Sequence, residues 1–102
     1  MNHYGEMARQ HWEQYRPNEY QAMVDKDQFF TDLGEQISAW ITELTPDFEG
    51  TPPPGETFTD KIGRLNFARL TAQEQVLREM LPQSEAEDQE QPAEQAEPVE
   101  TE

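Results

Sequence analysis

The sequence predicts an all-α protein: a small helical bundle with two long helices, a shorter N-terminal helix pair and a disordered acidic C-terminal tail. Three observations predict this fold. Apolar residues recur at intervals of three and four, prolines divide the chain into segments of helical length, and no segment shows strand-like alternation of useful length. We therefore expect one helical domain, residues 1–82, with a proline-rich linker at 46–57 between the two long helices.

The N-terminal segment predicts two short helices. Six residues fall on one helix face: Tyr4, Met7, Ala8, His11, Trp12 and Tyr15. Arg16 should end this helix, because the residue before a proline is pushed out of the α region. Pro17 suits the first turn of a second short helix that carries Tyr20, Met23 and Val24.

The clearest periodic segment, residues 28–44, predicts the first long helix. Its apolar stripe is formed by Phe30, Leu33, Ile37, Trp40 and Leu44. Asp25 or Asp27 is expected to cap its N-terminus, and Thr45-Pro46 is expected to stop it. The linker that follows contains three consecutive prolines, which favour a stiff, extended polyproline II segment.

The second long helix is expected to begin near Thr57 or Thr59 and to run to Leu81, where Pro82 stops it. Its apolar residues cover more than one narrow stripe, so we expect it to pack on two sides. A break near Leu70 is the alternative, because a capping-box pattern follows directly, but an uninterrupted helix is expected.

Charge is unevenly distributed along the chain, which has 22 acidic and 7 basic residues and a net charge of −15. Residues 83–102 contain 8 acids and no Lys or Arg, so residues 1–82 keep 14 acids and 7 bases, a net −7. Such an acidic, proline- and glutamine-rich segment cannot bury enough apolar surface to order itself, which predicts a disordered tail. Two acid-first i,i+4 pairs, Asp60–Arg64 and Glu74–Arg78, are expected on the second long helix.

Composition excludes several classes of function. The chain has no cysteine, which excludes disulfides, thiolate metal sites and thiol nucleophiles. It has no apolar run long enough for a transmembrane span, and its N-terminus lacks the pattern of a secretory signal. An acidic surface repels phosphate and anionic lipid, so we expect no direct nucleic-acid or membrane binding. A basic surface on another protein is the favoured partner, including that of a nucleic-acid-binding or host-defence protein.

Catalytic and metal-binding patterns are not found in the sequence. His3 and His11 are eight residues apart, about 12 Å along a helix, which is too far for both to bind one ion. No phosphate-binding loop, nucleophile elbow or zinc-protease motif occurs. The sequence therefore predicts a protein that is not an enzyme and that has no catalytic residues, no cofactor and no metal.

Candidate partner-binding residues are polar or aromatic side chains in apolar segments. They are Arg69, Asn66, Trp12, Tyr15, Tyr20 and Trp40. Arg69 lies where an apolar stripe would otherwise continue. A structural ion pair with an acid on the first or third helix is the favoured interpretation, and an anchor for a partner is the alternative. The aromatic residues are expected in the core, with any surplus forming a binding patch.

One set of residues forms a pattern that spans roughly residues 3–81: Tyr4-Gly5, Met7, Arg16-Pro17, Tyr20, Asn66, Ala68-Arg69, Ala72, Glu74, Val76-Leu77 and Glu79. This pattern resembles the small TnpV-type proteins of transposons and related mobile elements, and it is most specific in the C-terminal helix. The chain is also similar to short proteins of actinobacterial mobile elements or phages. The resemblance implies a genetic context and a bacterial cytoplasmic location, and it carries over no catalytic residue.

Two functions are expected from these observations. The first is a non-enzymatic protein–protein interaction module, monomeric or homodimeric, which binds a basic protein surface on behalf of a mobile element or phage. The alternative is an anti-defence inhibitor, anti-restriction or anti-CRISPR, that acts partly as an acidic DNA mimic. An interaction module needs an exposed apolar or aromatic patch, whereas a mimic needs carboxylates aligned across helices.

Overall fold

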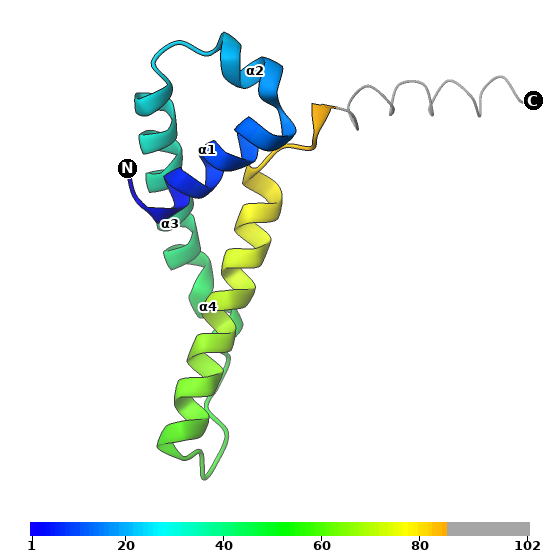
Figure 1. The fold of residues 1–102 in the computed structure, drawn as a ribbon. Coiled ribbons are helices and arrows are strands. Elements are labelled where there is room, and N and C mark those ends of the chain that lie inside the picture. The colour runs from blue at the N-terminus through cyan, green and yellow to red at the C-terminus, as the bar shows by residue number, and fades with distance from the viewer. Residues whose placement is uncertain (86–102) are drawn as a thin grey trace, which may run out of the picture.

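The computed structural model describes residues 1–85, which form four helices (Figure 1). They are α1 (His3–Tyr15), α2 (Pro17–Ala22), α3 (Lys26–Glu49) and α4 (Phe58–Met80). Helices α3 and α4 form a long antiparallel hairpin, and α1 crosses this hairpin near the end that is opposite its connecting loop (Figure 1). Residues 1–85 contain no strand, so the predicted all-α bundle is confirmed.

The predicted helix ends at the N-terminal pair and at α4 are confirmed. Pro17 occupies the first turn of α2, and Arg16 lies between the two short helices. Thr57 caps α4 by accepting a hydrogen bond from the Asp60 amide at 3.1 Å, and the helix continues through Leu70 without a break. No helix within the described part of the chain is long and apolar enough to cross a membrane.

The predicted stop of the first long helix at Pro46 is wrong. Helix α3 continues through this proline to Glu49, so the linker begins at Gly50 rather than at residue 46. Pro46 lies near the C-terminal end of α3, where few backbone hydrogen bonds depend on it. Phe48, which packs against the core one residue before the last, holds this final turn in place.

The core consists of two clusters that lie along α3. Between α3 and α4, the buried residues are Ile37, Ile41, Ala72 and Val76. Between α1 and α3, they are Ala8, Trp12 and Phe30. Leu33 packs against both clusters and so joins them. Three members of the predicted stripe, Phe30, Leu33 and Ile37, therefore point into the core as expected.

Helices α1 and α3 cross at two glycines. A Cβ atom on Gly34 would lie 2.8 Å from the Cα of Gly5 and 2.6 Å from its nitrogen, so only glycine permits this approach. Asn2 fixes the crossing. Its Oδ1 accepts a hydrogen bond from the Gly5 amide at 2.8 Å, and its Nδ2 donates one to the Gly34 carbonyl at 3.0 Å. One amide side chain therefore caps α1 and ties it to α3.

Arg64 holds the end of the hairpin at the linker. The helical spacing predicts Asp60 as its partner, but the structure shows other partners. Its guanidinium binds Glu56 in the linker, with Nε to Oε2 at 2.7 Å and Nη2 to Oε1 at 3.2 Å. It also donates to the Glu49 carbonyl at 2.8 Å. The expected Asp60–Arg64 pair is thus replaced by a clamp across the linker, whereas the expected Glu74–Arg78 pair forms at 3.7 Å.

Candidate functional site

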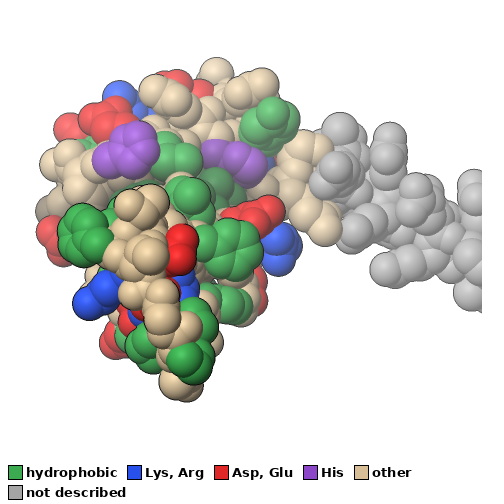
Figure 2. All heavy atoms as spheres, turned by 90° about the horizontal axis from the view of Figure 1, so that it is seen from below, with side chains coloured by type: hydrophobic (Ala, Val, Ile, Leu, Met, Phe, Trp, Pro, Cys, Tyr) green, Lys and Arg blue, Asp and Glu red, His purple; other side chains and the backbone are tan. Residues whose placement is uncertain are grey.

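Large apolar side chains lie exposed on the half of α4 that is nearest the linker. Phe58 is 78% exposed, Phe67 68%, Leu70 60% and Ile62 42%. Ile62, Phe67 and Leu70 share one side of the helix with Gly63 and Asn66, because these positions follow the 3-and-4 spacing of a helix face. We call these five residues the distal α4 face. Apolar side chains are visible on the surface at this end of the hairpin (Figure 2).

Tyr4 of helix α1 reaches this side of α4, in the half of α4 that is farther from the linker. The Tyr4 hydroxyl donates to Gln73 Oε1 at 3.0 Å, and Gln73 continues the row of Ile62, Asn66 and Leu70 toward the C-terminus. Helix α1 is 13 residues long and packs mainly on the first half of α3. The neighbouring helix therefore covers the row at Gln73 and leaves the distal α4 face bare.

Asn66 and Arg69 are both exposed on α4. The structural ion pair that was the favoured interpretation of Arg69 is not found within residues 1–85, where no carboxylate lies within ion-pair distance of its guanidinium. Its side chain lies beside the distal α4 face. Arginine is enriched at protein-binding hot spots, and exposed apolar patches mark interaction sites.

The aromatic candidates occupy other positions. Trp12 is buried against Ala8 and Phe30, and Trp40 packs half-buried against the cluster between α3 and α4. Tyr20 lies half-buried below the Lys26 ammonium, 5.2 Å from its ring centroid. Partial withdrawal from water raises the pKa of the Tyr20 hydroxyl above its ordinary value, and the nearby Glu13 carboxylate adds to the rise.

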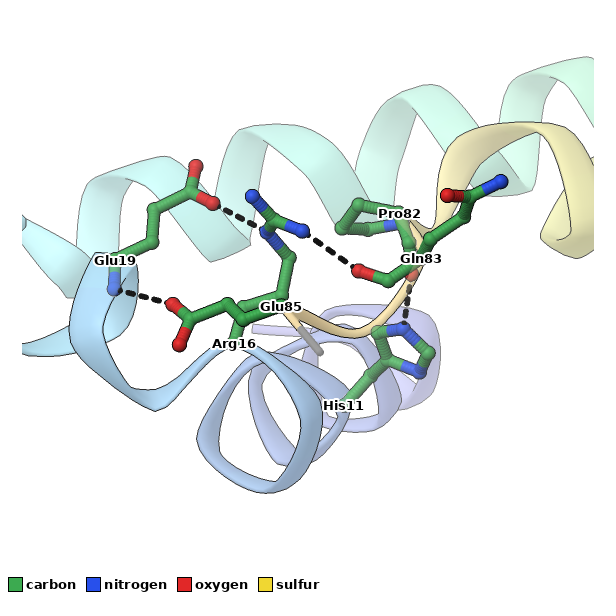
Figure 3. Close-up of polar contacts among 6 residues, drawn as sticks. All are labelled: His11, Arg16, Glu19, Pro82, Gln83 and Glu85. Atoms are coloured by element: carbon green, nitrogen blue, oxygen red, sulfur yellow. Dashed lines mark hydrogen bonds and ion pairs between the residues drawn. The ribbon is translucent and has the colours of Figure 1, made fainter. Parts of the chain in front are cut away.

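Tyr15 is 43% exposed and lines a shallow, open hollow of about 300 Å³ with His11 and Pro82. The His11 Nε2 lies 2.7 Å from the Pro82 carbonyl (Figure 3). Within residues 1–85, no group of three or more His, Cys, Asp or Glu side chains is arranged to hold a metal ion. The hollow offers one imidazole, already hydrogen-bonded to backbone, and its lining adds the Tyr15 phenol, the Gln83 amide and the Ser84 hydroxyl.

Residues directly after α4 also contact the N-terminal helices. Arg16 donates to the Gln83 carbonyl at 2.7 Å, and the Glu19 amide donates to Glu85 Oε2 at 3.0 Å (Figure 3). Residues 83–85 of the predicted tail thus lie against the junction of α1 and α2. The rest of that tail, residues 86–102, lies outside the described residues, as does its predicted disorder.

Acidic side chains gather on α3. This helix has 6 acids and 1 base, a net −5, whereas α4 has 3 acids and 4 bases, a net +1. Asp32, Glu35, Glu43 and Asp47 are all exposed, and α3 has no Lys or Arg after Lys26. The two long helices therefore present surfaces of different character: an acidic one on α3, and an apolar one with a weak positive charge on α4.

Sequence reasoning missed Phe67, Leu70 and Ile62 as candidate binding residues, because it expected partner helices on two sides of α4. The signal was nevertheless present in the width of the apolar pattern. A helix that is apolar over more than one stripe needs more neighbours than a four-helix chain with two short members can supply. One side of α4 was therefore bound to remain uncovered.

Comparisons with known proteins give no relatives for this chain: no family model, no curated protein and no solved structure matches it. The resemblance to TnpV-type proteins therefore stays a prediction from the residues that carry it.

Proposed function

We propose that this protein is a non-enzymatic protein-interaction module that docks protein surfaces on the distal α4 face. The observation that carries the proposal is the exposure of Ile62, Phe67 and Leu70 on one side of a single helix. Contiguous apolar surface of this kind is costly in water and marks interaction sites in soluble proteins. Asn66 and Arg69 supply polar contacts at the same place.

The partner we propose has a basic surface. The exposed carboxylates of α3 and the net charge of −15 create a negative field that attracts positively charged proteins and repels nucleic acid. Such a field raises the rate of encounter and selects among partners, while the apolar contact on α4 supplies most of the affinity. We further propose, from the sequence resemblance, that the module serves a mobile element or phage in a bacterial cytoplasm.

A second candidate, an anti-defence inhibitor that mimics DNA, is favoured by the unbroken acidity of α3. Four exposed acids, Asp32, Glu35, Glu43 and Asp47, lie along about 22 Å of this helix at ~1.5 Å per residue. One DNA strand presents about six or seven phosphates over that length, at ~3.4 Å each. The sparser spacing on α3 supports the interaction module over the mimic.

Affinity capture from a bacterial lysate tests the proposed function. The bait variant Phe67→Glu/Leu70→Glu places two charges on the distal α4 face, and we expect it to lose proteins that the wild-type chain captures. The control variant Gln36→Glu/Ala39→Glu adds the same two charges at exposed positions of α3 and should retain them. Each captured protein is then purified, and its Kd is measured by titration calorimetry, where a rise of at least about tenfold is expected for the α4 variant.

Two further variants separate the contributions of charge. In the first, Asp32, Glu43 and Asp47 are replaced by their amides, and we expect slower association and a weaker dependence on salt. In the second, the acids of the C-terminal segment are replaced by amides: Glu87, Asp88, Glu90, Glu94, Glu97, Glu100 and Glu102. Equal binding by wild type and the Phe67→Glu/Leu70→Glu variant would contradict the proposed docking face. Competition with duplex DNA for a captured nuclease would favour the mimic.

A further inference from the structure

Gly63 is a glycine in the interior of α4 with no packing neighbour in the described chain. A Cβ atom added there would meet no atom within 4 Å. The other two helical glycines, Gly5 and Gly34, lie where two helix backbones touch. Glycine weakens a helix interior, and a glycine at such a position commonly serves a close backbone approach. Gly63 lies beside exposed Ile62 and Phe67, on the distal α4 face.

We propose that the distal α4 face is a homodimer interface, on which α4 of a second copy packs in the antiparallel direction with Leu70 of each copy against Gly63 of the other. This inference rests on the proposed function, because it takes the distal α4 face to be a docking surface, and it names the occupant. Self-association therefore competes with the docking of another protein on this face, whereas the acidic side of α3 stays exposed in the dimer.

The sequence of α4 fits a two-fold axis between Asn66 and Phe67. In an antiparallel pair centred there, Gly63 lies opposite Leu70 of the second copy, and Asn66 lies opposite Phe67. A two-fold interface uses one patch twice, so a small residue and a large one at matched distances from the axis complement each other. The space above Gly63 receives the leucine, which is the side chain that the monomer leaves 60% exposed.

Charge selects α4 as the helix through which two copies can meet. Each chain has a net charge of −15, so most surfaces of two copies repel each other. Helix α4 has a net charge of +1, so contact through α4 brings no two acidic surfaces together. Contact through α3 would bring one helix with a net charge of −5 against another with the same charge. The five residues of the distal α4 face are uncharged, and the charged residues Arg69 and Asp60 lie at its two edges. In the antiparallel pair, Glu74 falls opposite Thr59 of the second copy.

The area is sufficient for a weak dimer. With aromatic side chains of about 200 Å² and aliphatic ones slightly smaller, the exposed fractions of Ile62, Phe67 and Leu70 amount to about 300 Å² per copy. Two copies would thus withdraw about 600 Å² of apolar side chain from water, and Asn66 and Arg69 add to this total, which stays below the ~1,200 Å² of stable specific interfaces and falls in the range of weak ones. We therefore expect micromolar rather than nanomolar association.

Sedimentation equilibrium of the full chain tests the dimer. Across a concentration series that spans the micromolar range, the wild-type mass should rise from the monomer value of 11.9 kDa toward twice that value. Gly63→Leu fills the expected contact point with a good helix former, and Phe67→Glu/Leu70→Glu charges it. Each should raise the dimer Kd at least about tenfold. Gln36→Leu, which adds the same leucine on an exposed position of α3, should leave the Kd unchanged.

A cysteine scan checks the geometry, because the chain has no native cysteine. Oxidation of Asn66→Cys should give a covalent dimer, since the two Cα atoms beside the axis come within disulfide reach, whereas Gln36→Cys should stay monomeric. Circular dichroism checks that each variant remains helical. A wild-type mass of 11.9 kDa at every concentration would overturn the dimer and leave the capture experiment on other proteins unaffected. A dimer that Gly63→Leu and Phe67→Glu/Leu70→Glu leave intact would place the contact elsewhere and also overturn the inference.

Discussion

Gly5 and Gly34 set the distance between α1 and α3, and a methyl group at position 34 would overlap with atoms of the N-terminal segment. It would meet the Asn2 side-chain oxygen and the backbone nitrogen and Cα of Gly5, so the whole of α1 would have to shift. At Gly63, the same methyl group meets nothing within 4 Å. Two identical substitutions in helices therefore have opposite effects on stability.

We expect Gly34→Ala to lower the free energy of unfolding by about 2 kcal/mol, because overpacking outweighs the gain in helix propensity. Gly63→Ala should raise it by about 0.5–1 kcal/mol, because only the gain in helix propensity acts there. Both changes are made in the Phe67→Glu/Leu70→Glu background, so that self-association does not contribute, and are measured by urea unfolding. A stabilised Gly34→Ala protein would show that the helices do not touch at this point.

Arg64 lies in a mostly buried ion pair, with 19% of its side chain and 9% of the Glu56 side chain exposed. Arg64→Ala leaves the Glu56 carboxylate without a partner and frees the Glu49 carbonyl, so we expect a loss of about 2–3 kcal/mol. Arg64→Leu/Glu56→Leu removes both charges and should cost less than Arg64→Ala alone. Thermal unfolding of the three proteins checks this order, and equal losses would mean that the clamp contributes by packing alone.

Single residues could be predicted well where local chemistry decides. Pro17 begins α2, and Thr57 caps α4, because proline in a first turn and a threonine cap act on neighbouring atoms. Arg64 escaped prediction because its partner Glu56 lies eight residues away, across the linker, where helical spacing gives no guide. The exposure of Arg69 could not be predicted from helical spacing either, because it depends on how far α1 extends along α4.

At the scale of elements, α3 shows how packing prevails over a local stop signal. Pro46 cannot donate a hydrogen bond, and its ring disfavours the helix that precedes it. The helix persists because its last turn carries Phe48 into the core and because Arg64 binds the Glu49 carbonyl. These tertiary contacts offset the cost of the proline.

Replacing this proline should therefore stabilise the protein. We expect Pro46→Ala to raise the free energy of unfolding by about 1–2 kcal/mol, because the missing backbone donor returns within a helix that is already formed. Pro53→Ala in the linker is the control. There a proline only restricts the unfolded chain, so alanine should lower stability by up to about 1 kcal/mol. Urea unfolding measures whether each variant has a higher or a lower free energy of unfolding than the wild-type protein. A destabilised Pro46→Ala protein would mean that α3 ends at residue 45 in solution.

Helix existence and type could be predicted because the periodicity of each segment is strong, as at Phe30, Leu33 and Ile37. The uncovered side of α4 could not be located, because it depends on the direction in which α1 crosses the hairpin. That direction is set by Gly5 and Gly34, and a glycine inside a helix gives no sign of which backbone approaches it. The candidate site is therefore a product of tertiary geometry rather than of a motif.

For the whole molecule, charge opposes folding. The ion pairs Arg9–Glu6, Arg16–Glu19 and Arg78–Glu74 are partly or largely exposed and contribute little against the mutual repulsion of a chain with a net −15. Salt screens repulsion and attraction alike, and the excess of acids makes the repulsion stronger than the attraction. Stability should therefore increase with ionic strength.

We expect the Tm to rise by about 3–6 °C between low and moderate NaCl concentration, which corresponds to less than about 1 kcal/mol for a domain of this size. Circular dichroism of the helical signal follows the transition. A neutral osmolyte such as sucrose at matched osmolality separates screening from solvent exclusion. A Tm that falls with NaCl would show that the ion pairs outweigh the repulsion.

The junction of Asn2, Gly5 and Gly34 also has a consequence for sequence divergence. Most positions of this fold accept exchange among apolar residues or among polar ones, because a helical bundle asks only for pattern and volume. Asn2, Gly5 and Gly34 do not accept such exchange. The Asn2 side chain must donate one hydrogen bond and accept another, and positions 5 and 34 must lack a side chain. A distant relative that keeps this crossing should therefore keep an asparagine before its first helix, a glycine three residues later and a glycine in its third helix. That spacing, rather than overall similarity, is the signature by which the fold could be traced.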